Sequence, residues 1–204
     1  LVQTLHGVFA EEIAQGTLTI IEGDVRNAVP EKIGLTAGNY ILAANIPYYI
    51  TGEIIRAFLT AHAQPKTMAL LVQKEVAERV ARSKKESILS LSVKAYGIPR
   101  FAVKVARGNF SPPPSVDSAI LVVERISRTF FKNLSEADFF TVVKKGFSAK
   151  RKLLAGNLSS FGKEKVLRAF LTAGIAPKAR AEDVPLTAWK ELAKALSQSQ
   201  QAES

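Results

Sequence analysis

A short polar and aromatic segment follows an apolar run near residue 40. The run covers residues 40–44 and is followed by Asn45, Ile46, Pro47 and Tyr48. This pattern indicates a buried parallel strand that delivers a loop to the carboxyl edge of a sheet, where open α/β sheets bind ligands. Asn45 offers a carbonyl oxygen, Pro47 fixes the turn, and Tyr48 offers a face for stacking, so the loop suits a flat ring with an amine. An ordinary strand exit with a buried Tyr is an equally open interpretation.

A proline-rich segment precedes a later apolar run. Residues 108–118 read Gly-Asn-Phe-Ser-Pro-Pro-Pro-Ser-Val-Asp-Ser, and the apolar run occupies 119–123. Three consecutive prolines restrict φ and form a stiff, polyproline-like segment that can hold Phe110 in a fixed position. The alternative is a rigid connection with Phe110 in the core, which is the usual place for a single Phe.

The C-terminal third of the chain is strongly basic. The net charge is +10, and 14 basic and 7 acidic side chains follow residue 127, against 14 and 11 before it. Such a basic region indicates a polyanionic partner, with nucleic acid as the first candidate and a membrane surface as the second. Its densest cluster comprises Lys144, Lys145, Lys150, Arg151 and Lys152. A run of cations is usually a solvated helix face, although Phe147 and Ser148 interrupt this one.

Taken together, these segments resemble the small-subunit rRNA adenine dimethyltransferases (KsgA type), which use S-adenosylmethionine. The sequences at 146–152, 157–159 and 177–184 resemble the C-terminal domain of that family, and the resemblance extends from about residue 23 to about residue 196. It implies an α/β, Rossmann-like S-adenosylmethionine-dependent methyltransferase sheet in residues 1–127, followed by a small all-helical rRNA-binding domain in residues 128–204.

The first strands of the family's sheet and their Gly-rich cofactor loop have no counterpart in this sequence. The chain starts instead within residues 1–13, where apolar side chains at helical spacing predict a helix. We therefore expect this chain alone to bind S-adenosylmethionine weakly and to be inactive.

The resemblance also implies roles for individual residues. Asn45, Pro47 and Tyr48 belong to the catalytic amino-methyltransferase motif, and Phe110 is its aromatic partner. Asn45 also joins the cofactor site with Asp24 and Val25: the carboxylate accepts from the amine of the cofactor's adenine, and the Val25 amide donates to its ring. Without the resemblance, a Gly-Asp pair after a strand is more often a turn. The five cations listed above are assigned to the RNA backbone.

The implied activity is methyl transfer from S-adenosylmethionine to the exocyclic amines of adjacent adenines in a small-subunit rRNA hairpin during ribosome biogenesis. The implied partner is the pre-ribosomal small subunit, and the protein is expected to be cytoplasmic and monomeric at full length. One alternative is a large-subunit rRNA adenine methylase of the antibiotic-resistance type, which the complete 108–118 string and Arg-Ala-Glu-Asp at 180–183 disfavour. The other is a non-catalytic RNA-binding assembly or transcription factor, which the intact Asn45 motif disfavours.

Composition narrows the chemistry further. The chain has no Cys and two His, which excludes disulfides, Cys-based zinc sites and Cys nucleophiles, and no metal site is expected. No apolar run approaches the roughly 20 residues of a membrane span.

The predicted elements alternate between strands and helices and then become helical only. Strands are expected at 17–21, 40–44, 67–72, 101–105 and 119–123, with the last two forming an antiparallel pair. Helices are expected at 51–61 (capped by Thr51), 74–81, 87–96 (ended by Gly97 and Pro99), from Ser135, at 162–173 and at 187–196. Trp189 is expected in the core of the small domain, and the tail 198–204 is expected to fray.

Overall fold

A mixed four-stranded sheet forms the centre of the described part of the chain, which in this computed structural model is residues 1–197. The strands are β1 (Ile41–Asn45), β2 (Thr67–Gln73), β3 (Ile98–Val105) and β4 (Ser118–Glu124), in the order β1-β2-β4-β3. β1 is parallel to β2, whereas β4 is antiparallel to both of its neighbours. The predicted antiparallel pair is thus confirmed, and the predicted tail at 198–204 lies outside the described residues.

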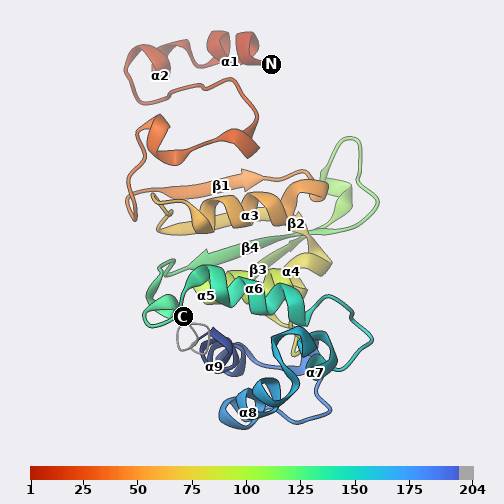
Figure 1. Cartoon of the computed structure of the whole chain (residues 1–204). Helices are drawn as coiled ribbons and strands as arrows, with labels where there is room; N and C mark the ends of the chain where they lie inside the picture. The colour runs from red at the N-terminus through yellow and green to blue at the C-terminus, as the bar shows by residue number, and fades with distance from the viewer. Residues whose placement is uncertain (198–204) are drawn as a thin grey trace.

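Three helices bury one face of the sheet (Figure 1). They are α3 (Thr51–Thr60), α4 (Lys74–Ala81) and α5 (Ile88–Tyr96). Side chains with period two along β2, namely Met68, Leu70 and Val72, pack with the apolar stripes of these helices and are fully buried. This layer fixes the strand ends that carry the predicted site.

The chain from residue 128 to 197 contains helices and turns only, as predicted. Its helices are α6 (Glu136–Gly146), α7 (Leu154–Asn157), α8 (Lys163–Ala173) and α9 (Leu186–Ser197), and they lie beside the sheet domain (Figure 1). Ser135 caps α6 by accepting a hydrogen bond from the Asp138 amide. A second core surrounds Trp189, which is fully buried as predicted. Since Leu91 and Ala95 of α5 also pack into this core, the division after residue 127 stays a prediction.

Arg128 links the two cores. Its guanidinium donates to the carbonyl oxygens of Thr60 and Ala61 at 2.7 and 3.2 Å, where α3 ends, and forms an ion pair of 2.6 Å with Glu136 at the start of α6. A cation at the carboxyl end of a helix and an anion at the amino end of another both complement the helix dipoles. The Tyr96 hydroxyl also donates to Glu136, so α3, α5 and α6 meet at one polar junction.

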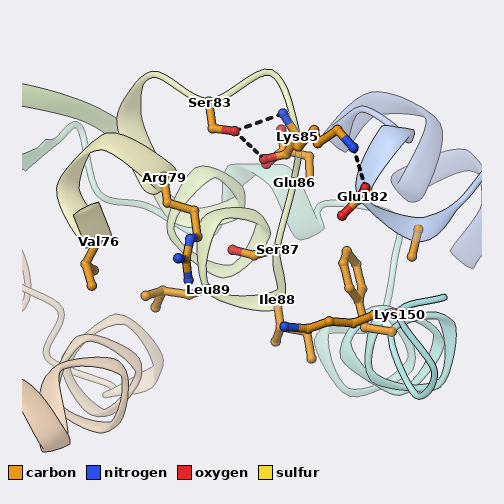
Figure 2. A pocket seen from close by; sticks show the side chains of 12 residues that line it. Val76, Arg79, Ser83, Lys85, Glu86, Ser87, Ile88, Leu89, Lys150 and Glu182 are labelled. Carbon is orange, nitrogen blue, oxygen red and sulfur yellow. Dashed lines mark hydrogen bonds and ion pairs between the residues drawn. The ribbon is translucent and has the colours of Figure 1, made fainter.

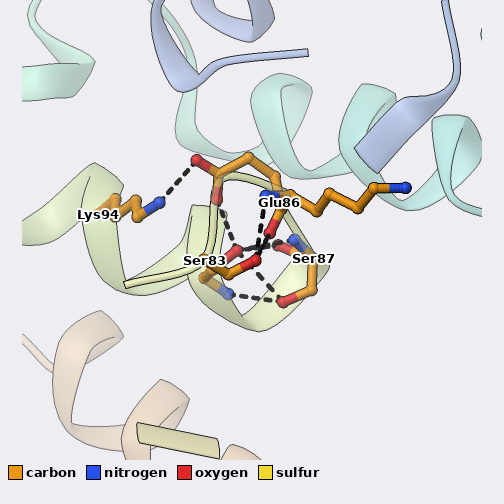
Figure 3. Close-up of polar contacts among 6 residues, drawn as sticks. Ser83, Glu86, Ser87 and Lys94 are labelled. Atoms are coloured by element: carbon orange, nitrogen blue, oxygen red, sulfur yellow. Dashed lines mark hydrogen bonds and ion pairs between the residues drawn. The ribbon is translucent and has the colours of Figure 1, made fainter. Parts of the chain in front are cut away.

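A second polar cluster stabilises the turn between α4 and α5. Ser87 caps α5 in a reciprocal capping box with Ser90. The largely buried Glu86 carboxylate accepts from the Ser90 hydroxyl and pairs with Lys94 at 2.7 Å, as Figure 3 shows in part. The Glu86 amide also donates to the Glu182 carbonyl at 2.7 Å, which joins this turn to the helical part of the chain.

The amino-terminal region differs from the prediction in two respects. The predicted helix is split into α1 (Val2–Val8) and α2 (Ala10–Ala14) at Phe9, and none of its residues is buried. The predicted strand at 17–21 is wrong, since these residues have no regular structure. A strand requires a neighbour for its backbone groups, and β1 pairs only with β2 among the described residues, while Ile21 is 58% exposed.

One predicted helix boundary is also wrong. Thr51 does not cap α3, because the turn Tyr48–Ile50 runs directly into the helix and gives Thr51 helical dihedrals; its buried hydroxyl has no hydrogen-bond partner in the described structure. α5 ends at Tyr96 with Gly97 as its C-cap, as predicted, but the next strand, β3, begins at Ile98 rather than at residue 101. It therefore includes Pro99, which an edge strand tolerates. A Cβ at Gly97 would lie 2.8 Å from the Glu124 carbonyl oxygen, so this close approach requires glycine.

Gly146 is the position where we expect a single methyl group to disturb the second core most. A Cβ there would lie 2.3 Å from Cη2 of Trp189 and 2.8 Å from Cδ1 of Leu154. Gly146→Ala should therefore lower the free energy of unfolding by about 1–3 kcal/mol, the usual cost of overpacking. Urea denaturation measures this change. Gly156→Ala is the matched control, because a Cβ at Gly156 meets nothing within 4 Å. Equal stability of the two variants would contradict this packing.

Candidate active site

The residues predicted to be catalytic line one pocket. β1 ends at Asn45, and the Ile46 amide makes the last contact with β2, donating to the Leu71 carbonyl at 3.3 Å. Pro47 has no N–H to extend the ladder, and the chain turns through Tyr48 toward α3. The pocket has a volume of about 280 Å³ and is lined by Asn45, Ile46, Pro47, Tyr48, Phe110, Pro112 and Pro114. The structure therefore brings the two predicted segments, far apart in sequence, to the same edge of the sheet.

The polar groups at the mouth of the pocket include two acceptors that have no partner in residues 1–197. Within the described residues, the exposed Asn45 side chain and the Ile46 carbonyl have no hydrogen-bond partner. The Pro47 carbonyl, by contrast, already accepts from the Ile50 amide at 3.1 Å. The Asn45 amide oxygen and the Ile46 carbonyl are therefore the groups available to accept hydrogen bonds from a ligand's amine.

Ser118, the first residue of β4, and Asp117 before it contact Tyr48 and the base of the Phe110 loop, which sequence reasoning missed. The Tyr48 hydroxyl lies 2.7 Å from the hydroxyl of Ser118, which is completely buried. On the other side, the Asp117 carboxylate accepts from the Arg107 amide at 3.1 Å and pairs with Lys104 at 2.8 Å, at the base of the loop that carries Phe110. Lys104 and the Arg107 amide hold the pKa of Asp117 below its usual range. Asp117 and Ser118 belong to the string noted in the sequence, yet nothing local assigns them these partners.

Asp24 and Val25 lie at a turn, Val25–Asn27, that packs against α3. The Asp24 carboxylate caps this turn and pairs with the Arg26 guanidinium at 2.5 Å. The side-chain and backbone hydrogen bonds from Arg26 lower the pKa of Asp24 to about 2, so it is ionised at neutral pH. Sequence reasoning missed Arg26, whose guanidinium bonds to the Asp24 carboxylate that was predicted to bind the cofactor.

The donor set at this turn fits an adenine ring. Asp24 is an ionised acceptor, and the Val25 amide has no acceptor among the residues that the structure describes. An acceptor followed by a free amide complements the amine and ring nitrogen on one edge of adenine. The residues present are therefore compatible with the predicted adenine end of S-adenosylmethionine.

The five predicted RNA-binding cations are all exposed. Lys144 and Lys145 lie in the last turn of α6, and Lys150, Arg151 and Lys152 lie in the turn before α7. None of them forms an ion pair within residues 1–197. Exposed cations without acidic partners among these residues, here in the last turn of α6 and in the turn after it, present positive charge without internal neutralisation.

The turn that carries these cations is anchored to the second core. Phe147 stacks on Trp189 with 5.6 Å between ring centroids, and the Asn157 side chain donates to the carbonyls of Gly146 and Ala149 at 2.6 and 3.1 Å. Asn157 belongs to a segment that the sequence resemblance includes, but its anchoring role depends on a contact that no local pattern predicts. The cations therefore sit on a fixed turn.

A second pocket, of about 550 Å³, lies where the helical part meets α4 and α5 (Figure 2). Arg79 and Lys150 reach into it from opposite sides, and Ile88 and Leu89 form part of its apolar lining. At its rim, Lys85 pairs with Glu182 at 2.5 Å, which contributes to a lowered pKa of Glu182. This ion pair joins the α4–α5 turn and the helical part of the chain at the rim of the pocket.

Residues 1–197 contain neither a metal-binding cluster nor a membrane-spanning helix. Among the described residues, no group of three or more His, Asp or Glu side chains is placed to hold a metal ion. Over the same part of the chain, no helix is both long and apolar enough to cross a membrane.

Comparison with known proteins identifies relatives over most of the chain. A ribosomal RNA small subunit methyltransferase A from Dehalococcoides mccartyi is 41% identical over 177 residues, covering 85% of this chain and 61% of that protein. The protein of the same name from Clostridium botulinum is 35% identical over 191 residues, covering 91% and 70%. The chain thus spans about three fifths of the length of the first relative.

Two solved structures share the fold. The 23S rRNA methyltransferase ErmE superposes with a TM-score of 0.68 at 22% identity, covering 96% of this chain and 77% of that one. A dimethyladenosine transferase from Plasmodium falciparum gives a TM-score of 0.72 at 20% identity, covering 93% and 77%. The model of one family, described as ribosomal RNA adenine dimethylase, matches residues 3–198. The chain therefore belongs to the ribosomal RNA adenine dimethylase family.

Proposed function

We propose that the protein carrying this chain dimethylates the exocyclic amines of adjacent adenines in a small-subunit rRNA hairpin, with S-adenosylmethionine as the methyl donor. The observation that carries this proposal is the pocket in which Asn45, Tyr48 and Phe110 meet. Its volume of about 280 Å³ is at the lower end of small-molecule sites, which suits one flat base that has been flipped out of its helix.

The chemistry of adenine explains why such a pocket is sufficient. The amine of adenine is a poor nucleophile, because its lone pair is delocalised into the ring. Hydrogen bonds from this amine to the Asn45 amide oxygen and the Ile46 carbonyl return electron density to the nitrogen. Holding the base between Tyr48 and Phe110 fixes its orientation, which is itself a large part of the rate enhancement. No strong general base is required.

The cofactor would be held in part by this chain. Asp24 and Val25 would bind its adenine, and Asn45 would lie between that site and the substrate base. When bound, S-adenosylmethionine supplies an electrophilic methyl group. We place the RNA backbone on Lys144, Lys145, Lys150, Arg151 and Lys152, within a helical rRNA-binding domain at 128–204 that accompanies a methyltransferase domain at 1–127.

The names of the sequence relatives support the small subunit as the target, since those proteins are called small subunit methyltransferases. The large-subunit alternative is supported only by the similarity to ErmE, and at 22% identity that similarity concerns the fold alone. Against the non-catalytic alternative, the free acceptors of Asn45 and Ile46 line the pocket.

A methylation assay distinguishes the three functions. The protein at its natural length is incubated with methyl-labelled S-adenosylmethionine and either immature small subunits or large-subunit rRNA, and nucleosides are separated after digestion. We expect labelled dimethyladenosine from the small subunit only. Label in the large-subunit rRNA alone would favour the resistance-type activity, and RNA binding without label would favour an assembly factor.

A further inference from the structure

Two consecutive residues, Asp117 just before β4 and Ser118 at its first position, contact the two segments that carry the aromatic walls of the pocket. Ser118 is paired with Gln73 of β2 and with Val105 of β3, so its position is fixed by ladders on both sides. Its buried hydroxyl lies 2.7 Å from that of Tyr48, and it has no other side-chain partner in the described structure. A hydrogen bond at this distance restricts the rotation of the Tyr48 ring about its backbone.

Asp117 anchors the base of the loop that carries Phe110. Its carboxylate accepts from the Arg107 amide and pairs with Lys104, so both contacts lie just before Phe110 in the chain. Its carbonyl oxygen accepts from the Lys74 amide at 3.0 Å, which fixes Asp117 to the start of α4. The loop that carries Phe110 therefore begins and ends at the same carboxylate.

We infer that Asp117 and Ser118 are positioning residues that together set the orientation and separation of Tyr48 and Phe110, and so the fit of the flipped adenine. Because Asp117 and Ser118 are adjacent and Ser118 is paired with strands on both sides, moving Tyr48 or the Phe110 loop requires the loss of a contact with one of these two residues. This inference rests on the proposed function of the pocket and deepens it, because it assigns the geometry of the base clamp to residues that do not line the pocket.

The hydrogen bond between Tyr48 and Ser118 is tested by removing each end. Tyr48→Phe keeps the stacking face and loses only the hydroxyl, while Ser118→Ala loses the other partner. In the protein at its natural length, each change should lower kcat about 5- to 10-fold with little change in KM for RNA, the scale of one neutral hydrogen bond. The kcat of the double variant should lie within about 2-fold of the kcat of the slower single variant, because both changes remove the same contact.

A spectroscopic readout separates positioning from folding. An RNA hairpin with 2-aminopurine at the target adenine should fluoresce more strongly when bound to Ser118→Ala, Tyr48→Phe or Asp117→Ala than to the parent, since stacking between two fixed rings quenches it. Ser115→Ala, in the same loop, is the control and should match the parent in rate and emission. Melting temperatures of all variants are measured alongside.

The possible outcomes separate this inference from the proposed function. An inactive parent protein would contradict the function itself. An active parent with kcat and emission unchanged in Ser118→Ala would overturn the positioning role, as would single-variant losses that multiply in the double variant. If Ser118→Ala does not fold, Tyr48→Phe decides alone: unchanged rate and emission overturn the inference.

Discussion

Replacing Asn45 with alanine is expected to lower the methylation rate of the natural-length protein by about 10²-fold or more, the scale of losing one preorganised transition-state contact. The Asn45 side chain is exposed at the end of β1, lines the pocket, and has no partner of its own in the described structure. Its oxygen is therefore free to accept from the amine as that nitrogen gains positive charge. Single-turnover rates measure the change, and calorimetry should show a smaller effect on cofactor affinity.

Two further variants sharpen this test. Asn45→Asp retains an acceptor oxygen, so it should lose less activity than Asn45→Ala if the accepting role is correct. Asn39→Ala is the matched control, since Asn39 is exposed in the turn before β1 and its side chain bonds only to Thr36 among the described residues. A near-normal rate for Asn45→Ala would remove this residue from the mechanism.

The parts of the site that the sequence predicts are those with a local pattern. The apolar run at 40–44, followed by Asn45, Pro47 and Tyr48, predicts a buried strand and the loop that leaves it. The structure confirms the strand and its exit, since β1 ends at Asn45. Phe110 is predictable for a similar reason, because the prolines that follow it stiffen its loop. Hydrophobic periodicity and residue propensity are sufficient to place a residue where its environment is simply solvent or apolar core, with no specific partner.

Specific partners far along the chain were not predictable. Tyr48 and Ser118 are 70 positions apart, and their contact depends on β4 lying between β2 and β3. The sequence indicates the β3–β4 pair but not its place next to β2. Gly97 likewise fits its position because of the Glu124 carbonyl across the ladder.

The wrong strand at 17–21 shows the limit of apolar patterning. Thr17 to Ile21 are β-branched or aliphatic and so favour an extended chain. A strand, however, is stabilised by the backbone hydrogen bonds and side-chain pairs of a neighbour, and none lies beside this segment within residues 1–197. Pattern therefore predicts a preference, while pairing decides the structure.

The cationic turn before α7 should control the salt dependence of RNA binding. Lys150, Arg151 and Lys152 are exposed, and the turn is fixed by Asn157 and by the stack of Phe147 on Trp189. If all three contact phosphates, changing them to glutamine should flatten the slope of log affinity against log salt by about 2–3 units, since each contact contributes somewhat under one. Filter binding of a small-subunit hairpin at several salt concentrations measures this slope.

The control for this experiment must remove the same charge from another place. Lys32, Arg56 and Lys66 are equally exposed and lie in the sheet domain, so their glutamine variant changes the net charge by the same amount. We expect its slope to stay near that of the parent. The cationic-turn variant should weaken all RNA sequences alike, because phosphates position a ligand without specifying bases. Methylation of a free adenine nucleoside, where measurable, should be untouched. If both triple variants flatten the slope equally, the effect comes from net charge and not from contacts at the turn. If the cationic-turn variant leaves the slope unchanged, its cations are only a solvated face, and the RNA-docking surface must be sought on the sheet domain instead.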